Sequence, residues 1–119
     1  MRYMLLIHAN PANFATLSEA EVGAMFAEYD AFTQRIVDSG EFVSGDPLAG
    51  PETATVVRVR GGVRSTTDGP YVETKEHLAG YYVVECASLD RALTIAADIP
   101  DAKTAGVEVR PLADMAMPS

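Results

Sequence analysis

The chain has 119 residues, the usual size of one domain and enough to form a hydrophobic core without a disulfide or a structural metal. Hydrophobic residues make up 48% of the sequence and charged residues 22%, which excludes global disorder. The formal charge of −8 repels phosphate backbones, and no run of lysine and arginine in the sequence offsets it. Nucleic acids and anionic membranes are therefore not expected partners.

The cysteine content and the N-terminus indicate the cellular compartment. Cys86 is the single cysteine, so the chain forms no internal disulfide and does not call for an oxidising compartment. The apolar run after Arg2 is too short for a membrane span or a signal peptide. We expect a cytoplasmic protein in which residues 1–113 form a single domain and residues 114–119 a frayed tail.

A strand and a long helix are the first predicted elements. Residues 2–9 form an apolar run that an Asn-Pro pair ends, which is typical of a central strand covered on both faces. Ser18 and Glu21 have the spacing of a capping box, and apolar residues follow at intervals of three and four until Gly40. This pattern predicts a helix over residues 19–39.

The second half of the chain is predicted to contain a hairpin, a strand, a helix and a last strand. The Gly-Gly pair at residues 61–62 is a hairpin turn signal, and a further turn is predicted at residues 45–47. Ser88 and Pro100 mark the start and the end of the second amphipathic helix. The predicted strands of this half cover residues 41–48, 53–60, 63–67, 78–86 and 106–112.

The order of these elements predicts the fold class. Strand, helix, hairpin region, strand, helix and strand together fit an α+β, ferredoxin-like split βαβ sandwich with an antiparallel sheet. In such a sandwich both helices cover one face of the sheet, and the other face still carries apolar side chains. A second subunit is the simplest cover for that face, so we expect a homodimer with its sheets facing each other.

One long motif connects the sequence to a known family. Residues 67–82 read Thr-Asp-Gly-Pro-Tyr-Val-Glu-Thr-Lys-Glu-His-Leu-Ala-Gly-Tyr-Tyr. This stretch resembles the DGPF-type signature of the YCII-related family, in which an Asp-Gly-Pro-aromatic turn precedes Glu-Thr-Lys-Glu and Gly-Tyr-Tyr. Residues 3–7, 97–100 and 107–111 also match, so the resemblance covers nearly the whole chain.

The resemblance implies a ferredoxin-like fold that pairs into a dimeric α+β barrel. Relatives with this architecture include small isomerases, monooxygenases and decarboxylating enzymes. Some DGPF-type members are encoded beside extracytoplasmic-function sigma factors, which implies a regulatory context for part of the family.

The chain departs from the family pattern at several positions. Tyr71 stands where the family usually has phenylalanine, and His77 stands where glutamine is more usual. The YCII branch has a proposed His–Asp active-site pair with the histidine on the first helix, but Tyr29 matches that helix position here. Asp98 lies close to the position of the acid without falling on it. The His–Asp pair is therefore not carried over to this chain.

The charged residues around the Asp-Gly-Pro turn are the catalytic candidates. In one interpretation Lys75 holds a substrate carboxylate while Asp68 or Glu76 moves a proton, because motif positions on a loop are often site positions. In the other interpretation Asp68 closes an Asx turn, and Lys75 forms a solvated ion pair with a neighbouring glutamate. The sequence leaves both interpretations open.

Further residues are candidates for binding a substrate. His8 ends the first strand, where a pocket could open, although a lone histidine is more often a hydrogen-bonded boundary residue. Tyr29 lies on the apolar face of the first helix, where core packing is the simpler explanation. The substrate-binding candidates are His8, Tyr29, Tyr71, Glu73 and Tyr82.

The sequence predicts no metal and no cofactor, and it leaves two classes of function. The two histidines do not have metal-ligand spacing, no phosphate-binding loop is present, and no basic residue flanks Cys86. The first class is a metal-free small-molecule enzyme that uses proton transfer near the Asp-Gly-Pro-Tyr and Glu-Thr-Lys-Glu motif. The second is a non-catalytic ligand-binding or regulatory module linked to an extracytoplasmic-function sigma factor. The expected partners are a second copy of the chain and a small-molecule ligand.

Overall fold

Four antiparallel strands form the main sheet of the computed structural model, which describes residues 1–72 and 74–113. The strand order is β2-β5-β1-β6, so the apolar first strand is central, as predicted. This order, with a helix in each of two crossovers, is consistent with the expected ferredoxin-like α+β fold. The strands span Arg2–Ala9 (β1), Phe42–Pro47 (β2), His77–Glu85 (β5) and Gly106–Pro111 (β6).

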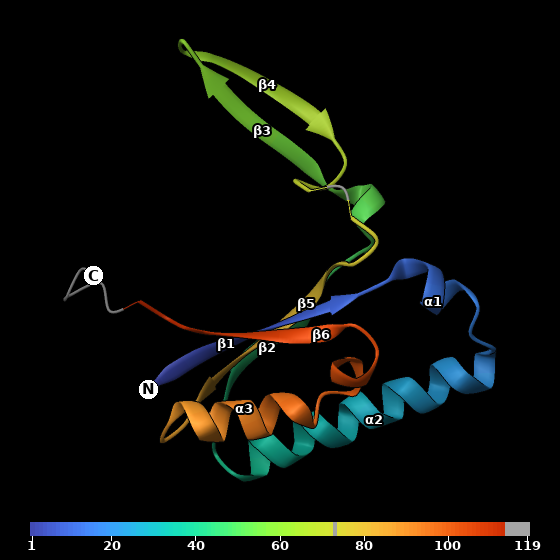
Figure 1. Ribbon diagram of the computed structural model, residues 1–119, viewed down its shortest axis with the longest axis vertical. Helices are drawn as coiled ribbons and strands as arrows, with labels where there is room; N and C mark the ends of the chain where they lie inside the picture. The colour runs from blue at the N-terminus through green and yellow to red at the C-terminus, as the bar shows by residue number, and fades with distance from the viewer. Residues whose placement is uncertain (73, 114–119) are drawn as a thin grey trace.

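Two helices cover one face of this sheet, and Figure 1 shows both on the same side. The capping box predicted at Ser18 is present, because its hydroxyl accepts from the Glu21 amide while the Glu21 carboxylate accepts from the Ser18 amide. None of the helices in the described part of the chain combines the length and the apolar character needed to cross a membrane. The helices are α1 (Pro11–Ala15), α2 (Glu19–Asp38) and α3 (Leu89–Ala97), with 3-10 turns η1 (Pro51–Thr53) and η2 (Pro100–Lys103).

The hydrophobic core lies between the sheet and these helices. Along β1 the residues alternate, with Tyr3, Leu5 and Ile7 buried toward the helices and Met4 and Leu6 half-buried on the other face. The helices therefore cover β1 on one face, and cover of the other face by a second subunit stays a prediction. The largest fully buried side chains are Leu5, Phe32, Val84, Ile95 and Ile99.

One local prediction is confirmed and another needs correction. The Asn-Pro pair at residues 10–11 ends β1 as predicted, and Asn10 then caps the short helix α1 by accepting from the Ala12 amide at 3.0 Å. The turn predicted at residues 45–47 is absent, because this segment continues as β2 and pairs with β5. Gly45 instead lets β2 lie close to the Tyr82 side chain of β5, since a Cβ built on it would lie 2.7 Å from Cδ1 of Tyr82.

The predicted hairpin forms a separate two-stranded sheet of β3 (Thr55–Arg60) and β4 (Val63–Asp68), here called the β3–β4 arm. The arm projects away from the main sheet on the side opposite the helices (Figure 1). It raises the radius of gyration to 16.5 Å, against roughly 13.5 Å for a compact chain of this length. At its base the Gly69 amide donates to the Ala54 carbonyl at 2.7 Å.

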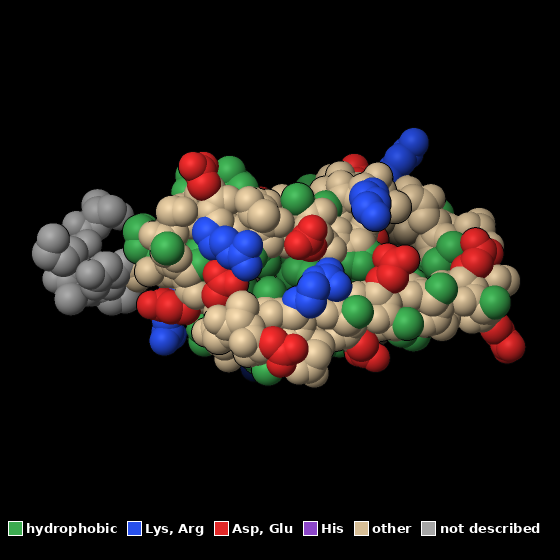
Figure 2. Space-filling view, turned by 90° about the horizontal axis from the view of Figure 1, so that it is seen from below, with side chains coloured by type: hydrophobic (Ala, Val, Ile, Leu, Met, Phe, Trp, Pro, Cys, Tyr) green, Lys and Arg blue, Asp and Glu red, His purple; other side chains and the backbone are tan. Residues whose placement is uncertain are grey.

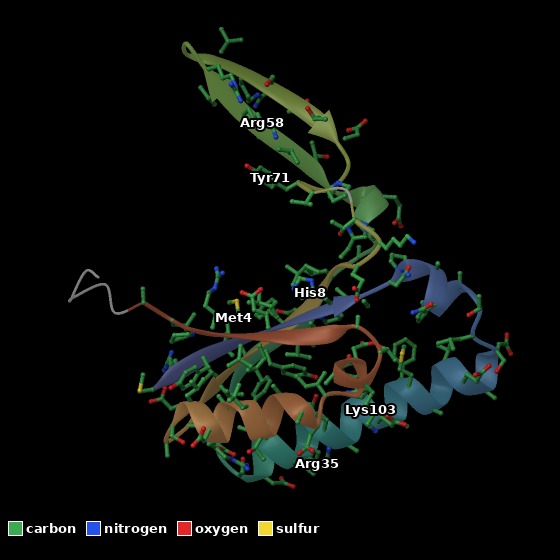
Figure 3. The ribbon with its side chains drawn as sticks, viewed as in Figure 1. Met4, His8, Arg35, Arg58, Tyr71 and Lys103 are labelled. Atoms are coloured by element: carbon green, nitrogen blue, oxygen red, sulfur yellow. The ribbon has the colours of Figure 1, made fainter. Side chains whose placement is uncertain are left out.

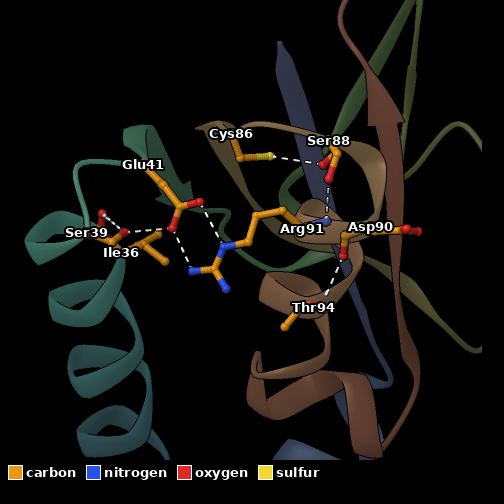
Figure 4. Close-up of polar contacts among 8 residues, drawn as sticks. All are labelled: Ile36, Ser39, Glu41, Cys86, Ser88, Asp90, Arg91 and Thr94. Atoms are coloured by element: carbon orange, nitrogen blue, oxygen red, sulfur yellow. Dashed lines mark hydrogen bonds and ion pairs between the residues drawn. The ribbon is translucent and has the colours of Figure 1, made fainter.

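An ion pair joins the two halves of the domain at the end opposite the arm. The Arg91 guanidinium donates to both carboxylate oxygens of Glu41, at 2.9 and 2.7 Å (Figure 4). The Ser39 hydroxyl donates to the same Glu41 carboxylate at 2.8 Å. Because Glu41 follows α2 and Arg91 lies in the first turn of α3, the pair holds these two helix ends together.

Candidate functional site

A hollow of about 340 Å³ lies at one end of the main sheet. It forms where β1 ends, β5 begins and β6 begins, so three distant parts of the sequence meet there. Figure 3 places His8 on the sheet face that no helix covers, on the same side as the β3–β4 arm. The lining residues are His8, Glu76, Ala105, Gly106, Val107 and Glu108.

The sheet register explains why His8 borders this hollow. The β1–β5 register shifts between Ile7 and His8, and such irregularities re-aim the side chains that follow them. On the other side His8 pairs with Gly106, which has no side chain to fill the space opposite the imidazole. Gly106 has a φ of 149°, a backbone conformation that favours glycine. The same residue therefore supplies the turn into β6 and room beside His8.

The motif segment 69–76 connects the arm to the start of β5. It brings Glu76 to the hollow, where the Thr74 hydroxyl donates to the Glu76 carbonyl. Asp68 ends β4 and is exposed, and Lys75 is exposed beside Glu76; neither lines the hollow. Of the three catalytic candidates, the hollow thus contains Glu76 alone.

Tyr71 packs at the base of the β3–β4 arm. It is 78% exposed, and the Arg58 guanidinium lies 5.6 Å from the centre of its ring (Figure 3). This cation–π contact ties the motif segment to β3. Glu73, also predicted to bind substrate, lies outside the described residues.

The two other tyrosine candidates belong to the layer between sheet and helices. Tyr82 packs against the core, with its ring 5.1 Å from that of Phe32 and its hydroxyl 2.7 Å from the Thr33 hydroxyl. The Tyr29 hydroxyl donates to the Asp101 carboxylate in η2. Burial, and then the neighbouring Asp101 carboxylate, raise the pKa of the Tyr29 phenol above its usual value of 10.0. Neither side chain lines the hollow at His8.

Two residues described above were not predicted from the sequence: Asp101, which accepts a hydrogen bond from Tyr29, and Gly106, which pairs with His8. Asp101 also accepts from the Thr104 hydroxyl at 3.0 Å, so it holds η2 against α2 through Tyr29. Asp98, which lies close in sequence to the position of the acid in the family's His–Asp pair, is the C-cap residue of α3. Pro100 is a local signal from which the start of η2 could have been predicted. No local pattern indicates that the Asp101 carboxylate accepts a hydrogen bond from Tyr29 on α2.

A second hollow, of about 270 Å³, lies on the helix-covered face between α2 and η2. Figure 2 shows acidic and basic side chains interspersed over this face. The charged lining residues are two acids, Glu28 and Asp98, and two bases, Arg35 and Lys103. This balance of charge favours neither anions nor cations, so the hollow at His8 is the stronger candidate.

Residues 1–72 and 74–113 bring no three His, Cys, Asp or Glu side chains close enough together to hold a metal ion. Cys86 is buried, and its thiol donates to the Ser88 carbonyl at 3.5 Å (Figure 4). The ionisable groups of the candidate site are therefore one imidazole and two carboxylates, those of Glu76 and Glu108.

The described residues form an α+β protein with a four-stranded antiparallel sheet, a helix in each of two crossovers and an inserted hairpin. Residues 1–116 match the family model of the YCII-related domain. The chain is also 34% identical over 115 residues to uncharacterized protein R00369 of Rhizobium meliloti (strain 1021), an alignment that covers 95% of this chain and 93% of the relative. The chain therefore belongs to the YCII-related family.

Proposed function

We propose that this protein is a small-molecule enzyme that transfers a proton in the hollow at His8, without a metal ion. One observation carries the proposal: His8 and Glu76 are far apart in the sequence, yet both line one hollow where the motif segment enters the sheet. Imidazole and carboxylate are the side-chain groups that most often move protons near neutral pH.

The size and surroundings of the hollow suit a small, polar substrate. Its volume of about 340 Å³ lies at the lower end of the range for small-molecule sites. Lys75 is exposed next to Glu76 and is the nearest motif cation in the sequence for a substrate carboxylate. In this proposal Glu76 or His8 removes the proton, and Lys75 attracts the anion.

Proton transfer can be detected before the substrate is known. The protein is incubated in D₂O with pools of small carbonyl and hydroxy carboxylic acids, and ¹H NMR follows the loss of C–H signals by exchange. We expect His8→Asn and Glu76→Gln to reduce the exchange rate by about 10²-fold or more, because each removes a proton-transfer group. Glu52→Gln, an exposed change in η1 outside the hollow, should leave the rate unchanged.

A non-catalytic ligand-binding or regulatory module is the second candidate. The observation that favours it is that Asp68 and Lys75 are exposed and do not reach the hollow. The same NMR samples separate the two functions. Ligand binding that His8→Asn abolishes, with no exchange of C–H protons, would establish a binding module and exclude the enzyme. Exchange that persists unchanged in both variants would exclude this hollow as the site.

A further inference from the structure

We propose that the hollow between α2 and η2 is a second binding site, for a small zwitterion whose ammonium and carboxylate groups are separated by one carbon atom, as in an α-amino acid. Figure 3 places Arg35 and Lys103, which line this hollow, on the helix side of the sheet and His8 on the other side. A ligand bound here is therefore separate from the proton transfer proposed at His8 and goes beyond it.

The shape of this hollow suits a ligand of a few non-hydrogen atoms. Three of the lining residues, Ala31, Ala97 and Pro100, are small and apolar, and the other four are charged. The small side chains do not fill the space between the longer charged ones, so about 270 Å³ stays open. This volume lies just below the range of about 300–1,000 Å³ for drug-sized ligands, so the hollow fits a smaller molecule.

The charges around the hollow match a ligand that carries both signs. Glu28 and Asp98 oppose Arg35 and Lys103, so the lining is neutral although the chain carries −8. None of the ion pairs within residues 1–72 and 74–113 involves these four side chains, so a ligand displaces no ion pair. A singly charged ion would be attracted by two of them and repelled by the other two. A zwitterion can be attracted by all four.

The elements that carry the acids and the bases assign the two ends of the ligand. Glu28 and Arg35 are seven residues apart on α2, which places them on one face of the helix, roughly 10 Å apart along its axis, on either side of Ala31. Asp98 is the C-cap of α3, at the negative pole of that helix. An acid there does not stabilise the helix, but it reinforces the pole and attracts an ammonium group. We assign the ammonium to Glu28 and Asp98, and the carboxylate to Arg35 and Lys103.

A hydrogen-bond network holds the η2 side of the hollow in place. Tyr29, next to Glu28 on α2, donates to the Asp101 carboxylate of η2, and the Thr104 hydroxyl donates to the same carboxylate at 3.0 Å. The network fixes η2, and with it the backbone of Lys103, against α2. A site that is already ordered binds its ligand at a lower entropic cost. This contact, which the proposed proton transfer does not use, thus has a role in the second site.

NMR titration of the ¹⁵N-labelled full chain with each of the common L-amino acids tests the proposal. We expect at least one of them to shift the amide signals of residues 28–35 and 97–103, with a dissociation constant of about 1 mM or below. Two analogues of that amino acid follow, one with a methyl group in place of the ammonium and one with a methyl group in place of the carboxylate. Each should bind at least about tenfold more weakly, because two charged side chains lose their partner.

Variants separate the charge of the hollow from its shape. Asp98→Asn and Lys103→Gln should each weaken binding at least about fivefold. Glu52→Gln in η1 and Arg64→Gln in β4 make the same changes of formal charge at exposed positions outside the hollow, and should bind within about twofold of the unmodified chain. Ala31→Leu keeps the charge and fills the space, so it should prevent binding. Circular dichroism confirms that all variants fold.

Three results would overturn the proposal. The first is that no amino acid shifts the amides of residues 28–35 and 97–103. The second is that the analogue without an ammonium binds as tightly as the amino acid, which would show an anion site. The third is that Asp98→Asn and Lys103→Gln bind as tightly as their controls. An amino acid that shifts only the amides around His8 gives the first of these results, and it leaves the proton transfer proposed there intact.

Discussion

Gly45 shows how one missing side chain fixes the packing of two strands. A Cβ at this position would lie 2.7 Å from Cδ1 of Tyr82 and 3.0 Å from the Tyr81 carbonyl oxygen. The Tyr82 ring cannot easily move aside, because it packs edge-on against Phe32 at 5.1 Å and bonds to Thr33. We expect Gly45→Ala to lower the free energy of unfolding by about 1–3 kcal/mol, measured by urea denaturation.

Gly23 provides the matched control for that substitution. It lies within α2, and no atom would come within 4 Å of a Cβ built there. Gly23→Ala should therefore stabilise the protein by about 0.5–1 kcal/mol, since alanine has the higher helix propensity. If Gly45→Ala raised the free energy of unfolding, as Gly23→Ala should, contact with Tyr82 would not be the reason for a glycine at position 45.

The Glu41–Arg91 pair predicts a specific dependence of stability on pH. The hydrogen bonds from Arg91, followed by that from Ser39, hold the pKa of Glu41 below its usual value of 4.5. Because the folded pKa is the lower one, this contribution is present above the unfolded value and is lost as the pH falls through the folded value. Glu41→Gln should lower Tm at pH 7 by roughly 2–5 °C and flatten the fall of Tm below about pH 4.5.

Calorimetry across this pH range provides the measurement, with Glu52→Gln as the exposed control. The control should follow the unmodified protein at every pH. A Tm difference between Glu41→Gln and the unmodified protein that stays constant down to pH 3 would contradict the assigned role of Glu41.

At the scale of elements, α3 depends on one buried stripe. Ile95 is 2% exposed and belongs to the core, whereas Leu93, two positions earlier on the same helix, is 47% exposed. Ile95→Ala should cost about 2–5 kcal/mol, because it removes buried methyl groups and leaves a cavity. Leu93→Ala should cost less than about 1 kcal/mol by the same denaturation assay. Comparable costs would show that α3 packs differently from the structure described here.

Elements with local signals could be predicted from the sequence, and elements that depend on distant partners could not. The capping box at Ser18 and the apolar stripe of α2 act within one helix, and the Gly-Gly pair acts within one hairpin. Gly45 carries the local signature of a turn, but its role depends on Tyr82, far along the chain. The error at residues 45–47 arose from interpreting a tertiary contact as a local one.

At the scale of the whole molecule, the same distinction limits the prediction of the site. His8 and Glu76 were candidates by residue type and motif, but their meeting depends on the register of β1 with β5 and β6. Asp68 and Lys75 share the motif with Glu76, yet neither lines the hollow. Membership of one motif therefore did not predict which side chains line the same hollow.

The base of the β3–β4 arm has a consequence for how this protein can change. The arm leaves and rejoins the domain at two backbone positions, Ala54 and Gly69, which already lie within hydrogen-bonding distance of each other. Residues between them can be lengthened, shortened or replaced without moving the ends that the rest of the fold must meet. The described contacts between the arm and the rest of the chain are this hydrogen bond and the Arg58–Tyr71 contact, so selection can adjust the reach of the arm and the surface of its tip independently of the sheet that supports the hollow.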